Sequence, residues 1–229
     1  MEITDSFGQT ATIAVPKHVK KLGISMSGGA DSSMLCYLVV KYLMITDRHD
    51  VVIHPVTCNW GVRPWSIGAA KNAVKFIANH TGFKNFGQHY KFHISKEDCT
   101  TDDFKEKLFG VNTSFMFGNE LIDHIFGGKT KNPPKEVMDT FYDKNFQSDR
   151  VEPTLENVYK SPVDTVPFAM VDKRFIIEQY RKEKALFDIL LNKITRSCEG
   201  DEVTTENYTN TCGKCWWCEE RAWAIEQTK

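Results

Sequence analysis

The alternation of apolar and polar positions predicts strands and helices that follow one another along most of the chain. Short apolar runs bounded by turn residues predict strands at 22–26, 51–57 and 125–126, the first two of them buried, and strict alternation at 89–94 predicts a half-buried strand. Apolar residues spaced three and four apart predict helices after the first two strands, at 113–123, and from residue 173 to about 191. Strands that alternate with helices of this length predict an α/β fold, a doubly wound parallel sheet of about five strands.

Two segments depart from this alternation. Residues 1–21 are polar around an apolar run at 10–15, which predicts an edge strand or a hairpin that ends at Pro16. Residues 143–165 show no clear periodicity and hold two of the eight prolines, so we expect an irregular connection or a lid there.

One stretch joins the first predicted strand to the first predicted helix, and it reads Ser27-Gly28-Gly29-Ala30-Asp31-Ser32-Ser33. Two adjacent glycines let the backbone turn tightly and approach a ligand closely. The unpaired N–H groups of the helix's first turn favour an anion, and the hydroxyls of Ser32 and Ser33 could contact a phosphate. Asp31 would repel a bound polyphosphate unless Mg²⁺ lay between them. The stretch therefore predicts a polyphosphate site with Mg²⁺, and it lacks the lysine of a Walker-type loop.

Two other loops are expected beside this stretch. In a doubly wound sheet, ligands bind outside the carboxyl ends of the strands, near the switch in strand order. The loop predicted at 58–65 contains Arg63, and the loop that follows the strand at 125–126 begins with Gly127. Both loops therefore belong to the same predicted site.

Four of the seven cysteines crowd the end of the chain in a C-x13-C-x2-C-x2-C pattern, as Cys198, Cys212, Cys215 and Cys218. The C-x-x-C spacing lets two thiolates reach one tetrahedral ion at about 2.3 Å, which favours a closed, structural Zn²⁺ site. An iron–sulfur cluster uses the same ligands, and spacing alone does not separate the two. We expect an α/β domain at 1–194 and a zinc-binding subdomain at 195–229.

Composition restricts the class of protein. The chain has 229 residues, 41% of them hydrophobic, enough for one large α/β domain with an appendage. Its 29 Lys and Arg balance 30 Asp and Glu, so no basic field recruits nucleic acid and we expect no stable nucleic-acid binding. No apolar stretch approaches a membrane span, and no apolar run follows Met1. With an odd cysteine count, these features predict a cytoplasmic protein with a metal site and no membrane association.

The loop and the cysteines together resemble one known family. The other matching segments are Trp60-Gly61-Val62-Arg63, Asn112 followed by Phe115, Lys173 at a helix start, Thr195-Arg196-Ser197-Cys198, and Cys212-Gly213-Lys214-Cys215-Trp216-Trp217-Cys218-Glu219-Glu220-Arg221. With the Ser-Gly-Gly-x-Asp-Ser loop, this set resembles the 7-cyano-7-deazaguanine synthase (QueC) family of PP-loop ATP pyrophosphatases. The resemblance spans most of the chain. It implies a Rossmann-like PP-loop fold of the adenine nucleotide alpha hydrolase-like (HUP) type.

The resemblance also implies an activity, an ATP-dependent carbon–nitrogen ligase of queuosine biosynthesis. Family members adenylate the carboxylate of 7-carboxy-7-deazaguanine, let ammonia displace AMP, and activate the amide again for dehydration to the nitrile. The implied catalytic residues are Asp31, Ser32 and Lys173, with Lys173 offsetting charge on the phosphates. The implied nucleotide-binding residues are Ser25, Met26, Ser27, Gly28, Gly29, Asp31, Ser32, Ser33, Arg63 and Gly127. The implied cofactors are ATP, Mg²⁺ and Zn²⁺, and the implied assembly is a homodimer.

Two residue types in this set have a second interpretation. A lysine that opens a helix, such as Lys173, also suits a solvated side chain. The Trp216-Trp217 pair lies between two predicted metal ligands. It is predicted to pack the metal site onto the domain or onto a dimer partner.

The chain departs from the family in its predicted substrate pocket. Residues 131–135 read Lys-Asn-Pro-Pro-Lys where the family has Tyr-Pro-Asp-Cys-Arg, and Val62 and Val111 replace a glutamine and an arginine. We therefore expect a divergent member that acts on 7-carboxy-7-deazaguanine or a close deazapurine analogue. One alternative is a tRNA-modifying PP-loop enzyme of the thiolase or lysidine-synthetase type, against which the balanced charge counts. Another is a nucleotide-binding or partner-modifying relative without this catalysis.

Overall fold

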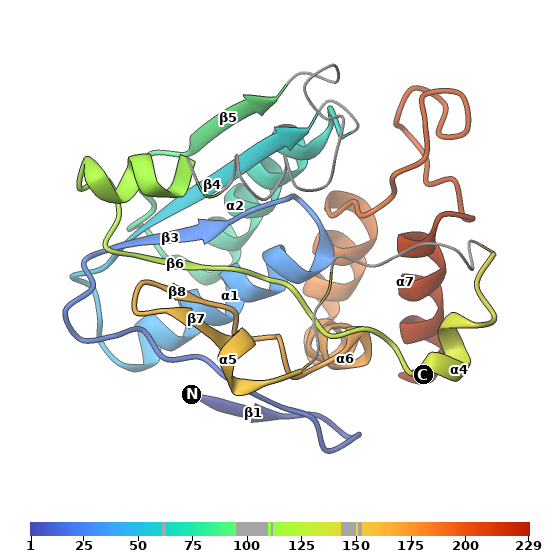
Figure 1. The fold of residues 1–229 in the computed structure, drawn as a ribbon, viewed down its shortest axis with the longest axis horizontal. Coiled ribbons are helices and arrows are strands. Elements are labelled where there is room, and N and C mark those ends of the chain that lie inside the picture. The colour runs from blue at the N-terminus through green and yellow to red at the C-terminus, as the bar shows by residue number, and fades with distance from the viewer. Residues whose placement is uncertain (61–62, 95–109, 111, 143–149, 151–152) are drawn as a thin grey trace.

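The computed structural model describes the chain apart from residues 61–62, 95–109, 111, 143–149 and 151–152 (Figure 1). The chain begins with an antiparallel hairpin of β1 (Glu2–Thr4) and β2 (Thr10–Thr12), as the pattern in residues 1–21 predicts. Gln9, in the turn of this hairpin, donates a hydrogen bond to the carboxylate of Asp172 at 3.2 Å. The hairpin is thereby tied to the start of a helix that is distant in the sequence.

Six strands form the central sheet: β3 (Lys21–Ser25), β4 (Val52–Trp60), β5 (Tyr90–Ile94), β6 (His124–Phe126), β7 (Tyr159–Ser161) and β8 (Asp164–Thr165). Their order is β5-β4-β3-β6-β8-β7. Every neighbouring pair is parallel except β7 and β8. The predicted α/β fold with a parallel sheet of about five strands is therefore confirmed, and one short antiparallel strand is added at its edge.

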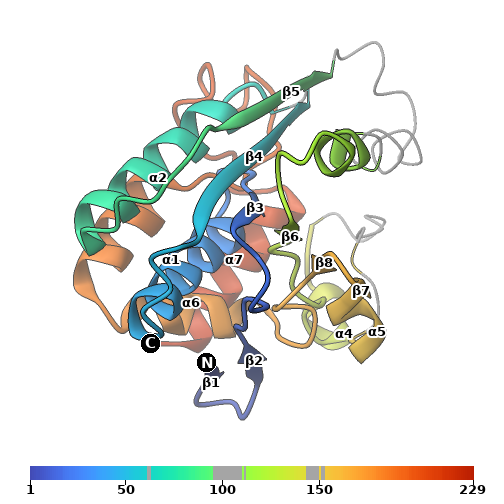
Figure 2. The ribbon, with the colours of Figure 1, turned by 90° about the vertical axis from the view of Figure 1, so that its left-hand side faces the viewer.

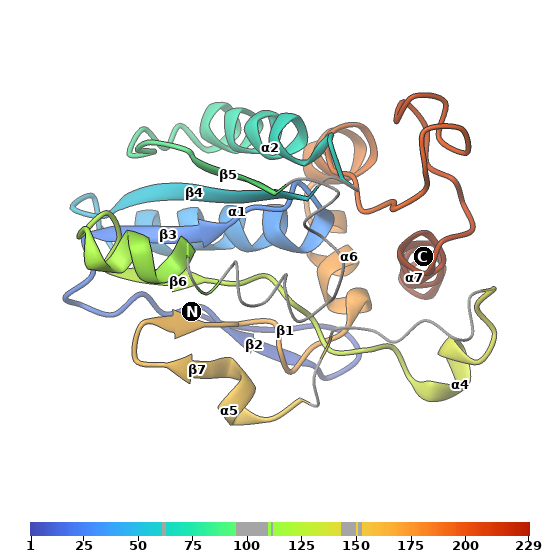
Figure 3. The same ribbon diagram turned by 45° about the horizontal axis from the view of Figure 1, so that its top comes forward.

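Helices cover the sheet and its carboxyl edge. They are α1 (Ala30–Ile45), α2 (Ser66–Thr81), α4 (Lys135–Met138), α5 (Leu155–Val158), α6 (Lys173–Arg181), the π-helix η1 (Leu186–Ile194) and α7 (Trp216–Gln227). Figure 2 shows α1 and α2 on one face of the sheet and the helical residues 112–118 on the other. Figures 1 and 3 show α7 beyond the carboxyl ends of β3 and β4, where it packs against α6.

The main core lies between β3 and α1. Leu22 and Ile24 of β3 are fully buried, and so are apolar residues on several sides of α1, because α2, α6 and the sheet all pack around this helix. A smaller apolar cluster on the opposite face joins Val56 to Met116 and Ile125. The two clusters fix the sheet between its helical layers, and they hold the start of α1 at the end of β3.

Strand β4 extends past its predicted end at residue 57 and takes in residues 58–60. These residues pair in register with the last three residues of β5, so a neighbouring strand extends β4 where local sequence predicted a loop. Pro55 is tolerated because its missing N–H faces the β5 side, where regular pairing begins only at Val56.

Other boundaries were also predicted wrongly. The helix predicted at 113–123 ends at residue 118. Within 143–165, the described residues form α5, β7 and β8 in place of an irregular connection, because β8 pairs with β6; residues 143–149 and 151–152 lie outside the described residues. Helix α6 ends at Arg181 rather than near 191, and Glu183 in the following turn accepts hydrogen bonds from Tyr37 and, at 2.8 Å, His80. The last helix begins at Trp216 instead of Glu219, with Cys215 at its N-cap.

The strand order locates the switch point of the sheet. Strand β3 lies between β4 and β6, and the chain proceeds to opposite sides of the sheet from these central strands. Open α/β sheets bind ligands outside the carboxyl ends of the strands at such a point, here beyond β3 and β6. In the part of the chain that the structure describes, no helix has both the length and the apolar character needed to cross a membrane.

Candidate functional site

The loop predicted to bind polyphosphate connects β3 to α1 at the switch point. Ser25 ends β3. The next residue, Met26, is buried, donates its N–H to Val56 at 2.7 Å and accepts the Thr57 hydroxyl at its carbonyl at 2.7 Å, so both of its backbone groups are already engaged. Gly28 has a φ of +77°, and a Cβ placed on it would lie 2.7 Å from the Cβ of Ala69. The loop therefore needs glycine here both for its backbone conformation and for its close contact with α2.

Serine hydroxyls hold the shape of this loop. The Ser27 hydroxyl accepts a hydrogen bond from the Gly29 N–H at 3.2 Å and lies 3.2 Å from the Ser32 hydroxyl. Gly29 is the N-cap of α1 and has no side chain to cap it, so the first turn of α1 keeps N–H groups for an anion. The buried Ser33 hydroxyl has no hydrogen-bond partner among the described residues. The predicted loop residues are thus brought together around one helix N-terminus.

The loop that follows β6 borders the same helix. The Gly127 N–H donates to Thr165 at 2.9 Å, which continues the sheet pairing past the end of β6. A Cβ on Gly128 would lie 2.9 Å from the Cα of Ser32, so the two backbones approach as closely as glycine allows. Gly127 was predicted for the site, whereas the closer residue Gly128 was not. The sequence feature that could have identified Gly128 is the pair of adjacent glycines, Gly127 and Gly128.

A lysine from a distant part of the sequence contacts the acid of the first loop. The Lys173 ammonium lies 2.6 Å from each carboxylate oxygen of Asp31. Asp172 caps α6 by accepting the Arg174 N–H at 2.9 Å, and this fixes Lys173 as the first residue of the helix. Lys173 is only 2% exposed, which excludes the alternative of a solvated helix lysine.

Two further charged residues complete a buried cluster that sequence reasoning missed. Glu220 of α7 is fully buried, forms a two-point ion pair with Arg150, and lies 3.3 Å from the Lys173 ammonium. Arg150 in turn lies 3.9 Å from Asp31. Two acids and two bases therefore share one site, and their formal charges sum to zero. We call these four residues, Asp31, Arg150, Lys173 and Glu220, the charge cluster.

The residues around the Cys pattern also contact the loop between β3 and α1. The Arg196 N–H donates to the carbonyl of Gly28 at 2.9 Å. Arg63, predicted to bind nucleotide, forms an ion pair with Glu199, which directly follows the first cysteine of the pattern. Trp216 is buried within its own chain, 5.7 Å from Phe141 between ring centroids. Trp216 therefore packs against Phe141 within the chain, and the homodimer stays a prediction.

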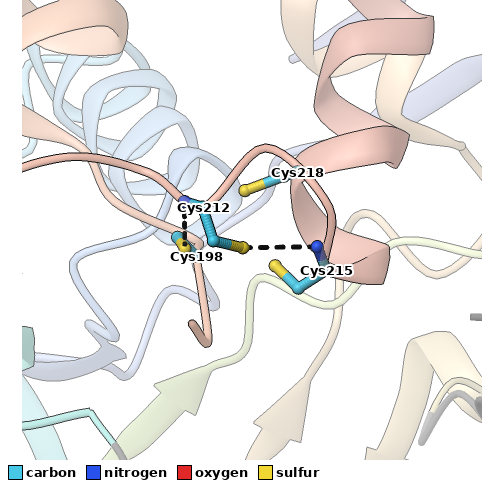
Figure 4. A group of neighbouring side chains, drawn as sticks. All are labelled: Cys198, Cys212, Cys215 and Cys218. Atoms are coloured by element: carbon cyan, nitrogen blue, oxygen red, sulfur yellow. Dashed lines mark hydrogen bonds between the residues drawn. The ribbon is translucent and has the colours of Figure 1, made fainter. Parts of the chain in front are cut away.

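The four cysteines of the pattern converge on one point (Figure 4). The sulfurs of Cys198, Cys212, Cys215 and Cys218 all lie within 4.8 Å of one another. Backbone N–H groups donate to two of them, from Cys212 to Cys198 at 3.2 Å and from Cys215 to Cys212 at 3.3 Å. A hydrogen bond from Cys218 lowers the pKa of Cys215 to about 5. The same contact raises the pKa of Cys218, and burial raises that of Cys198. The convergence of the four sulfurs is the observation that fits a metal ion.

A histidine beneath the site makes stability depend on pH. His124 of β6 is buried, its Nε2 lies 2.9 Å from the Thr165 hydroxyl, and burial lowers its pKa from 6.5 to about 4. As the pH falls, the imidazole of His124 is protonated at a higher pH in the unfolded chain than in the folded chain. The contribution of neutral His124 to the free energy of unfolding is therefore present above about pH 6.5 and is lost as pH falls through 4. We expect the thermal midpoint to drop between pH 7 and pH 4.5, and to drop less in His124→Gln. Exposed His49→Gln should follow the wild type, and equal pH profiles for all three proteins would contradict this prediction.

Comparisons with known proteins give fold likeness alone. No protein-family model and no curated protein matches the chain. Among solved structures, the U34-tRNA thiolase NcsA from Methanococcus maripaludis with its 4Fe–4S cluster aligns with 14% identity and a TM-score of 0.45, over 91% of this chain and 71% of that one. The NAD+ synthetase from Burkholderia pseudomallei aligns with 13% identity and a TM-score of 0.42, over 92% of this chain and 78% of that one. Neither likeness is close enough to assign a family or an activity.

Proposed function

We propose that this chain is an ATP-dependent enzyme that cleaves ATP between its α- and β-phosphates and so activates a carboxylate. The observation that carries the proposal is the contact between Lys173 and Asp31, 2.6 Å from each oxygen. A Ser-Gly-Gly-x-Asp-Ser loop by itself could be an ordinary turn. A buried lysine from a separate helix, held at the acid of that loop, supplies the fixed cation that phosphate chemistry needs.

Different groups in the loop would contact different parts of a bound polyphosphate. The N–H groups at the start of α1 would bind phosphate oxygens, and the Ser32 hydroxyl lies beside them. Asp31 would face a bound Mg²⁺, whose chemistry is to neutralise charge on the phosphates. Lys173 lies at the same carboxylate and would then meet the phosphates, where it offsets the charge that develops as pyrophosphate leaves.

The finer proposal concerns the substrate. We propose an ATP-dependent ligase of the 7-cyano-7-deazaguanine synthase type, acting on 7-carboxy-7-deazaguanine or a close deazapurine analogue with ammonia. Its support is the motif set shared with that family, which combines the loop at 27–33, Lys173 and the four cysteines. The altered residues 131–135 begin three positions after Gly128, so a changed pocket would lie near the intact loop.

For the cysteines we propose one structural Zn²⁺ ion. Four sulfurs around a single ion lie closer together than four sulfurs on the separate irons of a cluster, and here all lie within 4.8 Å of one another. Four thiolates leave no open position for a substrate, so the ion would supply folding free energy rather than catalysis. Its residues also hold the segment that contacts Gly28.

Product analysis tests the proposed reaction. Purified protein would be incubated with ATP, Mg²⁺, ammonium and 7-carboxy-7-deazaguanine, and mass spectrometry would read both the nucleotide and the base. We expect AMP with the nitrile, or AMP with the amide if the altered pocket prevents the second activation. Reactions without ammonium and without the base are the matched controls. ADP as the only nucleotide product would contradict cleavage between the α- and β-phosphates.

A further inference from the structure

The charge cluster joins the loop between β3 and α1 to α7, the helix that carries Cys218 and has Cys215 as its N-cap. Glu220 lies between the two cations, paired with Arg150 at 2.9 Å on one oxygen and 3.3 Å from the Lys173 ammonium. Both cations also face Asp31, Lys173 at 2.6 Å and Arg150 at 3.9 Å. The two cations thus lie between Asp31, which follows the loop, and Glu220, which belongs to α7.

The position of Glu220 is fixed by contacts of α7, and not by the loop between β3 and α1. Helix α7 starts at the N-cap Cys215, and Cys218 lies two residues before Glu220. On the other side, Arg221 donates to the carbonyls of Leu191 and Thr195, which anchors the first turns of α7 to the C-terminal end of η1. Glu220 is therefore held by the fold on both sides.

The surroundings of Arg150 support the same arrangement. Its guanidinium lies 5.0 Å from the ring centroids of both Trp216 and Trp217, and it donates to the Lys131 carbonyl at 3.2 Å. Aromatic faces and a carboxylate hold a guanidinium in one plane, which presets its N–H groups. Arg150 is thus a rigid cation within reach of the acid that faces the polyphosphate.

We propose that Glu220 is a positioning residue, which holds Lys173 and Arg150 as two preset cations for the polyphosphate and moderates their charge. This inference rests on the proposed function, because it assigns the polyphosphate to the loop between β3 and α1. Glu220 brings the formal charge of the charge cluster to zero. Because a neutral cluster does not neutralise the phosphates by itself, Mg²⁺ must accompany the nucleotide. For the same reason pyrophosphate can leave after cleavage.

The sign of one substitution distinguishes this role from a structural one. Glu220→Gln keeps the shape and removes one negative charge beside the two cations. Coulombic attraction over several ångströms at an intermediate dielectric then strengthens polyphosphate binding by roughly tenfold. We expect a KM for ATP about tenfold lower and a kcat lower by a similar factor, because pyrophosphate leaves more slowly from a more positive site. Loss of a merely structural contact would weaken binding.

The experiment is a calorimetric titration of ATP with Mg²⁺, and of pyrophosphate with Mg²⁺, into wild type and variants of known metal content. Glu219→Gln is the matched control, since the neighbouring Glu219 accepts the Tyr142 N–H at 2.9 Å and lies outside the charge cluster. Arg150→Gln removes a cation and should bind about tenfold more weakly. The double variant Arg150→Gln/Glu220→Gln restores neutrality and should return to within about threefold of wild type.

Each outcome either supports the inference about Glu220 or overturns it. Tighter binding by Glu220→Gln, with Glu219→Gln unchanged, supports the inference. If Glu220→Gln fails to fold, weaker binding by Arg150→Gln and its recovery in the double variant support it instead. Wild-type affinity in Glu220→Gln, weaker binding there with the metal retained, or no recovery in the double variant overturns the inference alone. A wild type that binds neither ATP nor pyrophosphate overturns the proposed function and this inference with it.

Discussion

Replacing Asp31 with asparagine is expected to reduce ATP-dependent AMP formation by at least about 100- to 1,000-fold, the range found when one preorganised electrostatic group is removed from an active site. The substitution keeps the size of the side chain and removes its charge. A neutral amide holds Mg²⁺ poorly. It also leaves the Lys173 ammonium with Glu220, 3.3 Å away, as its nearest remaining acid. Lys173 thereby loses the contact that fixes its ammonium to the loop that would hold the phosphates.

The control for this prediction lies at the other end of the same helix. Asp47 follows α1, is exposed, and has a φ of +55°, a conformation that asparagine tolerates. Asp47→Asn should therefore keep both the activity and the thermal midpoint of the wild type. Rates would be measured as AMP released per unit time, and circular dichroism would show that both variants are folded. Near-normal turnover in Asp31→Asn would exclude the assigned role of the loop.

Replacing Cys215 with serine is expected to remove the bound metal and to lower the thermal midpoint by well over 10 °C. Metal binding to a site that exists only in the folded chain contributes directly to folding free energy, about 10–16 kcal/mol for isolated structural zinc peptides. Cys215 is the N-cap of α7, so the start of the helix that carries Glu220 would loosen as well. Metal content would be measured by mass spectrometry and stability by calorimetry.

A second cysteine provides the comparison for this variant. Cys58 lies outside the four-cysteine group, and its sulfur accepts a long hydrogen bond from Asn112 at 3.8 Å. Cys58→Ser should therefore keep one metal ion per chain. One equivalent of zinc in the wild type would support a single ion. Iron with acid-labile sulfide would instead indicate an iron–sulfur cluster at this site. A metal-free Cys215→Ser protein with unchanged stability would contradict a structural site.

The parts of this molecule that sequence located are those set by local backbone chemistry. Gly28 must adopt a positive φ, and strand, loop and helix follow one another within a few residues, so the pattern alone identified the loop and its helix. The two C-x-x-C units likewise bring their sulfurs together through short spacing. The parallel sheet followed from the alternation of strands and helices.

The parts that sequence missed depend on contacts between distant segments. Lys173 was named through a resemblance, but its contact with Asp31 joins residues 142 positions apart. Glu220 stands in a run of charged residues that is typical of an exposed helix face, but α7 packs against α6 and Arg150 pairs with Glu220, which is buried. Arg150 lies in a segment without periodicity, where no pattern marks a buried cation. Buried charges that neutralise one another leave no trace in hydrophobic spacing.

The central claim, that the loop between β3 and α1 binds the pyrophosphate part of ATP, is tested most directly by competition between pyrophosphate and ATP in a Mg²⁺-containing titration. This measurement needs no knowledge of the carboxylate substrate. We expect one ATP site per chain, from which inorganic pyrophosphate displaces ATP and which is lost in Asp31→Asn. ATP binding that is indifferent to pyrophosphate, or that persists at wild-type affinity in Asp31→Asn, would contradict the claim.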